Sequence, residues 1–262
     1  MSSSHGSAPT TGHIDTPHLR LTWSEAPWDT AVFGRPVIQI TAMEIRGPDA
    51  LRDFRSFEAA REAADAALVS CRLDHAALRE SMLLEERGFR FIEMLYQPFL
   101  EPLPETTADI SNRLEAGRAE AEEVETIAEI AGTVFRHERF HVDPRLDPAL
   151  GDRRYRNWVR SSFDHPRQRL YSVRDQGRVV AFFVTEMLDD DCCYWHLNGV
   201  SAHCQGQGYG RRAWLTMLGL AREQGATRVQ TAIVARNNRV LNLYARLGFR
   251  FPPPLMTLHW VG

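Results

Sequence analysis

The chain has 262 residues, of which 44% are hydrophobic and 25% charged. This length suits one large or two modest domains with their own cores, and it excludes a short disulfide scaffold. The net charge of −3 predicts no electrostatic attraction to nucleic acid. All 31 basic residues are arginine, which excludes a catalytic lysine, a P-loop lysine and a Schiff base.

The cysteines and the hydropathy indicate a cytoplasmic protein. The 4 cysteines form no CxxC pair, so we interpret them as reduced thiols, and we expect no metal. No apolar run approaches the roughly 18 residues of a membrane span, and residues 1–13 lack the hydrophobic segment of a secretory signal. We therefore expect no membrane association, and a disordered tail over residues 1–17.

The first half alternates strands and helices. We predict strands at 19–23, 36–42, 68–73 and 89–100 and helices at 49–68 and 75–87, with Gly88 as a left-handed C-cap. Pro102, Pro104 and the polar run 105–112 predict a linker. These signals define an amino-terminal domain over 18–104.

The second half has a clearer rhythm. We predict helices at 119–135, 152–163, 211–224 and 238–247, a loop at 137–148, and strands at 170–173, 179–188, 192–200, 228–235 and 256–261. Three antiparallel strands followed by a parallel crossover predict an α+β (α/β) domain over 113–262.

One short segment occurs twice. Residues 83–91 and 243–251 both read as a helix, a glycine cap and the string Gly-Phe-Arg-Phe. If the repeat is genuine, Leu84 stands where Tyr244 stands, and the first half is a decayed copy without chemistry. The alternative is that any helix closed by Gly-Phe has this pattern.

A glycine-rich loop, Gln205-Gly206-Gln207-Gly208-Tyr209-Gly210, lies between a predicted strand and a predicted helix. Glycines allow a tight turn and a close approach of the backbone, so that successive N–H groups and the helix end form a cradle for phosphate. The alternative is a plain strand-to-helix turn. A Walker loop would need lysine, and a dinucleotide fold would need repeated βαβ units.

The loop resembles the pyrophosphate loop of the GNAT acetyltransferases, R/Q-x-x-G-x-G/A. A second GNAT signature, N-x-x-A-x-x-L-Y-x-x-x-G-F, is matched by Asn237, Leu243, Tyr244, Gly248 and Phe249, with Val240 replacing its usual alanine. The resemblance covers 119–261. It implies a GNAT fold with a mixed central sheet flanked by helices, preceded by a smaller degenerate GNAT-like domain.

The resemblance also implies acetyl-CoA as cosubstrate. The coenzyme-binding residues it implies are Val200, Gln205, Gly206, Gln207, Gly208, Tyr209 and Gly210. Arg211 and Arg212 are further candidates, although arginines on helix surfaces are common. Asn237 is another, although it could simply cap its helix.

A narrower resemblance covers almost the whole chain. Trp28-Asp29-Thr30 with Phe33-Gly34, and Arg139-Phe140-His141-Val142-Asp143-Pro144 with Trp158, resemble GNAT enzymes that acetylate nucleotide-linked amino-deoxy sugars, the dTDP-fucosamine acetyltransferase type. This resemblance implies acceptor binding by Arg139, His141, Asp143 and Trp158. The alternative for the loop is a capped, salt-bridged turn.

Acetyl transfer to an amine needs a proton acceptor for the amine and a proton donor for the departing thiolate. The resemblance implies Tyr244 as general acid, with a core aromatic as the alternative. Glu186 and His196 are candidate bases, as are His141 and Asp143. The alternatives are a solvated carboxylate for Glu186 and a hydrogen-bonded core residue for His196.

The expected function is therefore an N-acetyltransferase that moves acetyl from acetyl-CoA to a small-molecule amine, with a sugar nucleotide as the favoured acceptor. Two rival functions are a GNAT enzyme for another small amine, amino acid or protein amino terminus, and a non-catalytic acyl-CoA-binding module. A homodimer is left open, because no feature of the sequence fixes the oligomeric state.

Overall fold

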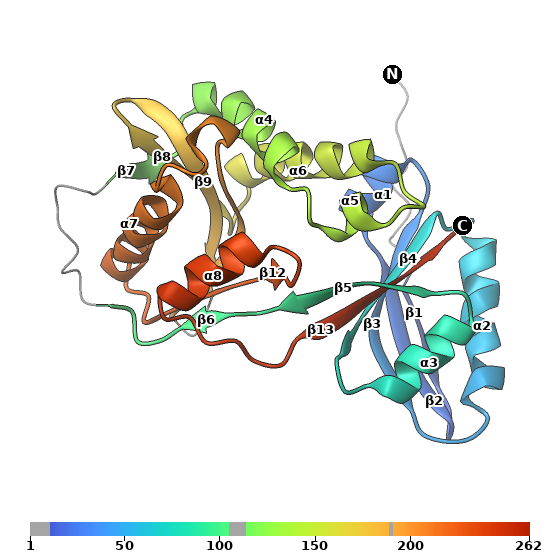
Figure 1. Ribbon diagram of the computed structural model, residues 1–262. Helices are drawn as coiled ribbons and strands as arrows, with labels where there is room; N and C mark the ends of the chain where they lie inside the picture. The colour runs from blue at the N-terminus through green and yellow to red at the C-terminus, as the bar shows by residue number, and fades with distance from the viewer. Residues whose placement is uncertain (1–10, 105–113, 189–190) are drawn as a thin grey trace. The chain divides into compact units, whose positions relative to one another are not determined.

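The computed structural model describes residues 11–104, 114–188 and 191–262 (Figure 1). The predicted linker 105–112 and most of the predicted tail lie outside these residues. Residues 11–15 form a strand paired with residues 20–24, so the expected disorder is wrong for this part of the tail. The chain divides into two compact units, unit 1 (residues 1–94 and 255–262) and unit 2 (residues 95–254). No helix in the described residues is long and apolar enough to cross a membrane.

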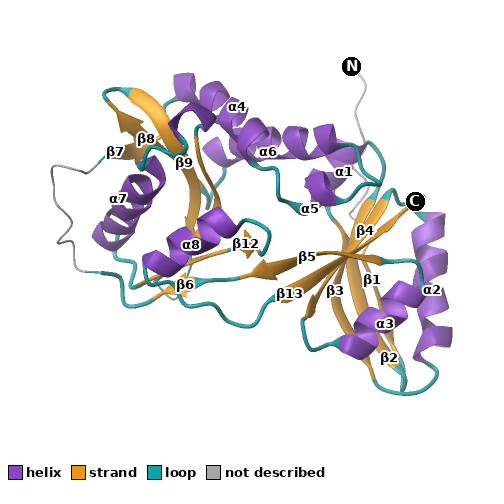
Figure 2. Ribbon diagram, viewed as in Figure 1, coloured by secondary structure: helices purple, strands orange, loops and turns teal. Residues whose placement is uncertain are grey.

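Unit 1 is built on one mixed sheet. Its strands are β1 (Thr11–Asp15), β2 (Leu19–Glu25), β3 (Val37–Ile45), β4 (Leu68–Asp74), β5 (Arg90–Tyr96, whose last two residues belong to unit 2) and β13 (Leu255–Val261). Its helices are α1 (Pro27–Phe33), α2 (Ala50–Ala63) and α3 (Leu78–Glu86). The strand order is β1-β2-β3-β4-β13-β5, as Figure 2 lets the reader follow.

The core of unit 1 lies between this sheet and α2 and α3. Phe54 and Phe57 of α2 and Leu84 of α3 are fully buried against the sheet. Helix α2 ends at Ala63, earlier than predicted, because Asp65 takes a positive φ of 50° and turns the chain into β4. Gly88, with φ 87°, closes the turn after α3 as expected for a left-handed cap.

Unit 2 is built on a second mixed sheet. Its strands are β6 (Phe99–Leu100), β7 (Glu115–Arg118), β8 (Arg169–Asp175), β9 (Arg178–Met187), β10 (Cys192–Val200), β11 (Arg228–Thr231) and β12 (Ile233–Val234). Its α-helices are α4 (Val124–Val134), α5 (Arg139–Val142), α6 (Pro148–Phe163), α7 (Tyr209–Glu223) and α8 (Asn238–Arg246). Single turns of 3-10 helix lie at η2 (Ala121–Glu123) and η3 (Ala202–Cys204). The sheet order is β6-β11-β10-β9-β8-β7.

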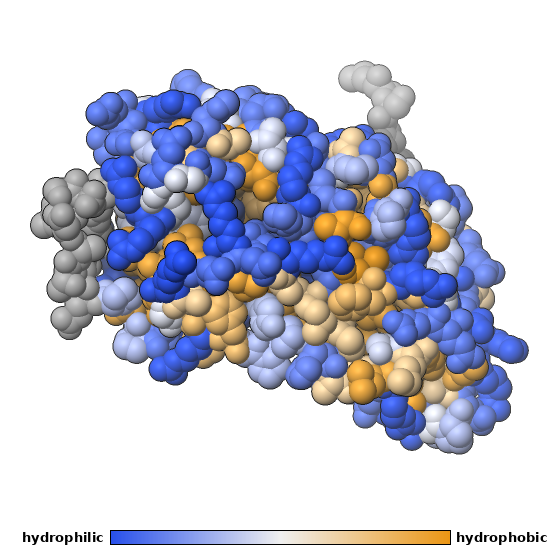
Figure 3. All heavy atoms as spheres, viewed as in Figure 1, coloured by the Kyte–Doolittle hydropathy of each residue, from blue (hydrophilic) through white to orange (hydrophobic). Residues whose placement is uncertain are grey.

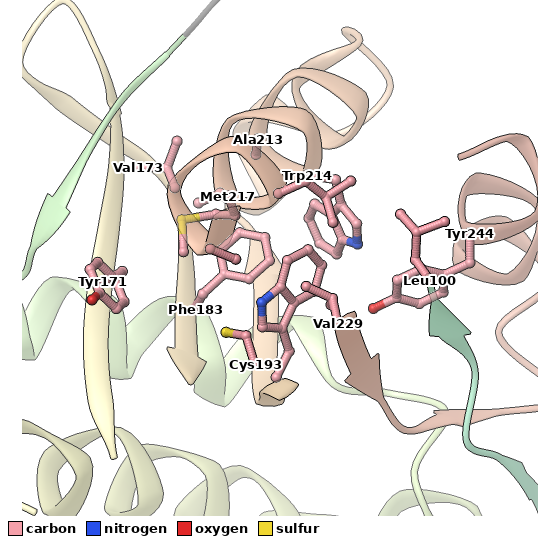
Figure 4. Close-up of a cluster of buried hydrophobic side chains, with 14 of the residues drawn as sticks. Leu100, Tyr171, Val173, Phe183, Cys193, Ala213, Trp214, Met217, Val229 and Tyr244 are labelled. Carbon is pink, nitrogen blue, oxygen red and sulfur yellow. The ribbon is translucent and has the colours of Figure 1, made fainter. Parts of the chain in front are cut away.

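The predicted topology of this sheet is confirmed. Strands β8, β9 and β10 are antiparallel neighbours, and β10 pairs with β11 in parallel. Two helix layers cover its faces. Helices α7 and α8 bury Trp214 and Tyr244 against one face (Figure 4), and α4 and α6 bury Ile127 and Val159 against the other. The visible surface over α4 and β8 is mostly hydrophilic (Figure 3).

Three details differ from the prediction. The loop after α4 contains the short helix α5. The predicted strand 228–235 is interrupted at Ala232, and its second part, β12, pairs with Leu95 and Tyr96. The final strand, β13, pairs along its length with β4 and so belongs to unit 1, not to the domain predicted over 113–262. Each of these depends on pairing or packing between residues distant in sequence, which local pattern does not encode.

Candidate active site

The sheet of unit 2 opens along its middle. Strands β10 and β11 pair only from Cys192 with Arg228 to Trp195 with Thr231, and β10 then continues to Val200 without β11. The backbone groups of β10 beyond Trp195 therefore have no parallel partner strand on that side. Thr231 closes the end of the paired part, because its hydroxyl donates to the Trp195 carbonyl at 2.9 Å.

A β-bulge lies at the point where the strands diverge. The register against β9 shifts between Trp195 and Leu197, which makes His196 the extra residue. Trp195 packs under α7 and α8 while Leu197 packs under α4 and α6, so the bulge inverts the alternation of side chains. As a result, Asn198 faces the layer of α8 and His196 faces the layer of α6.

The glycine loop connects this opening to α7. Gly206 and Gly208 have φ of 82° and 84°, and a Cβ at either would meet no atom within 4 Å. Among the described residues, their N–H groups donate no backbone hydrogen bond. The N–H groups of the first turn of α7 also lack partners within the helix. The loop therefore presents backbone N–H groups without backbone partners beside open space at both glycines, the kind of arrangement that anion sites at helix starts use.

Side chains around the loop hold its shape. Gln205 Nε2 donates to the Val200 carbonyl at 3.1 Å, and Gln205 Oε1 accepts from Arg239 Nη1 at 3.1 Å. Gln207 Nε2 donates to the His203 carbonyl at 2.7 Å. The side chains of Gln205 and Gln207 are thus engaged in holding the loop itself.

The first turn of α7 carries four of the predicted coenzyme residues. Tyr209 Oη donates to Asp175 Oδ2 at 2.7 Å, and Arg212 Nη1 lies 3.6 Å from the same oxygen. Arg211 is exposed, and Gly210 packs near Leu243 of α8. Asp175, the last residue of β8, therefore fixes the start of α7.

Asn237 is the N-cap of α8. Its Oδ1 accepts from the Val240 N–H at 3.3 Å, which satisfies one of the free donors at the start of the helix. The capping role foreseen for Asn237 is confirmed, and it orients the helix that carries Tyr244.

Tyr244 reaches from α8 into the core of unit 2. The residue is 1% exposed, and its ring lies 4.7 Å from Phe249 and 6.3 Å from Trp214 between centroids. Figure 4 shows its hydroxyl directed into the cluster, where Oη lies 3.5 Å from Asn198 Oδ1. Burial raises the pKa of Tyr244 above its usual 10, so the phenol keeps its proton at neutral pH.

Glu186 and His196 meet on the opposite face of the sheet. His196 Nε2 lies 2.9 Å from Glu186 Oε2, and Arg167 Nε lies 2.7 Å from Glu186 Oε1. The His196 ring also packs against Tyr194 and Trp158, with centroids 4.8 and 6.2 Å away. Burial lowers the pKa of His196 below its usual 6.5, although the hydrogen bond to Glu186 opposes that shift. The ring is therefore neutral at pH 7.

Trp158 is held on α6 beside this cluster. Its Nε1 donates to Gln168 Oε1 at 3.2 Å, and the guanidinium carbon of Arg154 lies 5.0 Å from the centre of its ring. An indole face of this kind can pack against the apolar face of a ligand's ring, while the neighbouring guanidinium binds an anionic group of the same ligand.

The segment Arg139 to Pro144 is a helical turn followed by an extended residue. Arg139–Val142 form the short helix α5 within the segment predicted as a loop. Asp143 is extended, as a residue before proline tends to be. Its carboxylate accepts two hydrogen bonds from the guanidinium of Arg145, one on each oxygen. His141 Nε2 lies 3.0 Å from Asp152 Oδ1, and the His141 side chain is only 4% exposed. These contacts match the salt-bridged turn that was the alternative for this segment.

The structure thus brings the predicted residues into two groups in unit 2. The glycine loop, Asn237 and Tyr244 surround the opening beside β10, and Glu186, His196 and Trp158 lie on its other face. Sequence reasoning missed Asp175, Asn198, Arg167 and Arg239. Of these four residues, only Arg239 could have been found from a local pattern, because it lies two residues after the predicted coenzyme residue Asn237. In the described residues, no group of three or more His, Cys, Asp or Glu could hold a metal ion.

Comparison with known proteins agrees with this arrangement. Residues 126–249 match the model of the Acetyltransferase (GNAT) family. A GCN5-related N-acetyltransferase from Kribbella flavida superposes with a TM-score of 0.62 at 18% identity, covering 97% of this chain and 90% of its own. A tandem GNAT protein from the clavulanic acid biosynthesis pathway gives 0.59 at 14% identity, covering 93% and 79%.

A GCN5-related glucosamine N-acetyltransferase region of a fungal multi-domain GH3 beta-N-acetylglucosaminidase gives a TM-score of 0.60 at 15% identity, covering 93% of this chain and 31% of its own. No curated protein matches the chain. The solved structures show that the chain has the mixed α/β GNAT fold, and its residues 126–249 are similar to the acetyltransferases of the GNAT family.

Proposed function

We propose that this protein is an N-acetyltransferase that moves an acetyl group from acetyl-CoA to the amine of a small molecule, by direct attack while both are bound. The observation that carries the proposal is the open end of β10, where the donor-rich glycine loop and the Tyr244 phenol converge from α7 and α8. Acetyl-CoA supplies a thioester whose acyl carbon accepts an amine.

The glycine loop would hold the diphosphate of the coenzyme. Its free N–H groups and the amino-terminal end of α7 favour negative charge there. Arg211 and Arg239 are exposed beside the loop and could add attraction without being built into it. The unpaired backbone of β10 between His196 and Val200 would accept the pantetheine arm.

Tyr244 is proposed as the general acid. The neutral amine forms a C–N bond with the acyl carbon while the C–S bond breaks. The amine loses one proton to a protein base, and the phenol gives one proton to the departing sulfur, so protons balance. The raised pKa of Tyr244 keeps this donor protonated across the neutral range. His196 and Glu186 remain the candidates for the base at this step.

The favoured acceptor is a nucleotide-linked amino-deoxy sugar. Trp158 and Tyr194 beside His196 offer aromatic faces suited to a sugar ring, and Arg154 over the Trp158 ring offers a cation suited to a phosphate. One protein of the same fold is described as a glucosamine N-acetyltransferase region, and glucosamine is an amino sugar. Arg139, His141 and Asp143 are proposed to support this acceptor site through α5 and α6.

Calorimetry and thiol release test the proposal. Coenzyme A titrated into the protein should release heat with one site per chain. Free thiol should then appear from acetyl-CoA when dTDP-4-amino-4,6-dideoxygalactose is added, more slowly with glucosamine, and slowest with amino acids and peptides. Binding without turnover for any amine would favour a non-catalytic acyl-CoA-binding module. Absence of binding would overturn the proposal.

A further inference from the structure

We propose that His196 is the general base and that Glu186, itself held by Arg167, is a positioning residue that fixes the tautomer of its ring. This inference rests on the proposed acetyl transfer and deepens it, because it separates the roles of two residues that sequence reasoning left as rivals. It stands on the geometry of three side chains from β9, β10 and the segment before β8.

Both oxygens of Glu186 are already engaged with neighbouring side chains. Oε2 lies 2.9 Å from His196 Nε2 and Oε1 lies 2.7 Å from Arg167 Nε. A carboxylate in such a pair is acceptor-only. The Glu186 side chain is 11% exposed, against 62% for Arg167. A reacting amine would therefore meet in Glu186 a largely buried carboxylate whose negative charge is already shared between His196 and Arg167.

The same contact leaves His196 with one available nitrogen. Because the Glu186 carboxylate can only accept, Nε2 carries the hydrogen, and the lone pair of the neutral ring is on Nδ1. Within the described residues, Nδ1 makes no hydrogen bond. The side chain is 22% exposed, so a substrate can approach it.

A second carboxylate–histidine pair in unit 2 gives the contrast. His141 Nε2 lies 3.0 Å from Asp152 Oδ1 in a similar contact, but the His141 side chain is 4% exposed. Among the described residues, its Nδ1 is buried without a hydrogen-bond partner. Access therefore favours His196 over His141 as the group that takes a proton from a substrate.

The bulge in β10 places His196 at the point where β10 and β11 diverge, the opening at which acetyl transfer is proposed. The residue directly follows Trp195, the last residue of β10 that pairs with β11. Tyr244 approaches the same stretch through Asn198, from the other face of the sheet. In the proposed step, Nδ1 takes the proton that the amine loses as the C–N bond forms. Tyr244 gives the proton that the sulfur gains, and solvent restores both groups.

The charged groups around His196 define the pH dependence. Glu186 on β9 stabilises the imidazolium, whereas His165, in the segment after α6, disfavours it. Arg167 weakens the effect of Glu186 through its own ion pair. Tyr194 on β10 and Trp158 on α6 contribute ring packing, and Arg154 lies beyond Trp158.

The test combines a tautomer measurement with pH profiles of the full chain. Imidazole ¹⁵N shifts of histidine-labelled protein, assigned with His196→Gln, should show Nε2 protonated and Nδ1 bare at neutral pH. Glu186→Gln should release this preference, and Glu186→Asp should restore part of it. Wild-type protein with the proton on Nδ1, or an unchanged tautomer in Glu186→Gln, would overturn the positioning role without any assay of acetyl transfer.

The kinetic arm uses dTDP-4-amino-4,6-dideoxygalactose and acetyl-CoA. His196→Gln should lower kcat about 100-fold, the usual scale of general base catalysis, and remove the acidic limb of the profile. Arg167→Gln should move that limb to higher pH, because Glu186 without its arginine partner stabilises the protonated His196 ring more strongly and raises its pKa. Glu186→Gln should move the limb to lower pH, because it removes that stabilisation. Glu125→Gln, which breaks an exposed pair with Arg160, is the matched control and should change neither.

The outcomes separate the two proposals. Turnover in His196→Gln with an unchanged acidic limb would overturn the base assignment and leave the transferase intact. No turnover of any amine by wild-type protein would overturn the proposed function and the base role together, while the tautomer result would still decide the role of Glu186.

Discussion

The phenol oxygen of Tyr244 lies 3.5 Å from Oδ1 of Asn198, so the last helix of unit 2 reaches the stretch of β10 that β11 has left. This contact joins two residues that are separated by the whole of α7 and β11. It gives the hydroxyl of the buried tyrosine a polar partner on the part of β10 that has no parallel neighbour.

Replacing Tyr244 with Phe removes only the hydroxyl. We expect kcat for thiol release to fall about 100-fold, on the scale of general acid catalysis, with little change in the KM for acetyl-CoA. Tyr171→Phe is the control, since Tyr171 is also a buried tyrosine, accepts a hydrogen bond from Gln224 and lies away from the opening. Equal kcat in the Tyr244→Phe and wild-type proteins would rule out the acid role.

The buried phenol also makes a prediction for alkaline pH. Because burial raises the pKa of Tyr244 above its usual 10, the donor form persists up to at least that pH. The wild-type profile should therefore show no loss of kcat from phenol ionisation between pH 8 and about pH 10. A fall in kcat near pH 9 in the wild type that is absent in Tyr244→Phe would contradict this assignment.

Gly208→Ala tests the phosphate cradle. The open space around Gly208 would accept a methyl group, but φ of 84° strains any L-residue by about 1–2 kcal/mol. We expect coenzyme A affinity to fall at least about 10-fold, because the methyl group would occupy the cradle and the strain would shift the loop. Gly225→Ala, with φ of 92° and equally open space after α7, carries the same strain. Calorimetry showing the same Kd for both variants would remove the loop from the binding site.

Asn237→Ala removes the cap of α8. The loss of a side-chain cap costs about 1 kcal/mol, which urea unfolding would detect. Asn237→Asp keeps an acceptor at the same atom and should retain the stability. If Asn237 also binds the coenzyme through its amide, Asn237→Asp will be as stable as wild type yet bind coenzyme A more weakly. Equal affinity would confine this residue to the capping role.

The ion pair of Glu123 with Arg174 should make the stability of unit 2 depend on acidic pH. Burial alone would raise the pKa of Glu123, but hydrogen bonds from Arg174, the Glu120 N–H and Ser172 outweigh it and lower the pKa below 4.5. A lowered folded-state pKa means that the stabilisation is complete above the unfolded value and is lost as pH falls through the folded one.

The corresponding experiment compares wild-type protein with Glu123→Gln. Urea unfolding at pH 7 should show a free-energy loss of about 2 kcal/mol in the variant, the scale of hydrogen bonds to charged groups. The two proteins should converge below the folded-state pKa. A difference that is constant from pH 7 to pH 3 would show that the charge of Glu123 has no part in it.

The sequence patterns correctly predicted those strands, helix caps and turns whose conformation depends on residues close together in the chain. Strand β10 has the predicted bounds, because its apolar residues are buried in the cores on both faces of the sheet, Cys193 and Trp195 on one and Leu197 on the other. The caps at Gly88 and Asn237 follow from backbone conformation and a side-chain acceptor three residues from its donor. The glycine loop was predictable for the same reason, since positive φ at Gly206 and Gly208 is a local property.

The rest depends on contacts between segments far apart in sequence. Glu186 and His196 were treated as alternative bases from the sequence, and their contact was not predicted. That contact depends on the register of β9 against β10 and on a β-bulge, and neither can be inferred from the residue types. Residues 137–148 were predicted as a loop, yet Arg139–Val142 form a helical turn that packs against α6. Asp143 is extended as predicted, because it directly precedes Pro144.

Strand β13 completes the sheet of unit 1 by inserting between β4 and β5. During synthesis on the ribosome, β4 and β5 emerge first and have to wait for their shared neighbour until all of unit 2 has been translated. A message cut short before residue 255 would leave two unpaired strand edges in the middle of a sheet, where they invite aggregation. Quality-control proteins could therefore recognise such an incomplete chain by the exposed edges of β4 and β5, even if unit 2 had already folded.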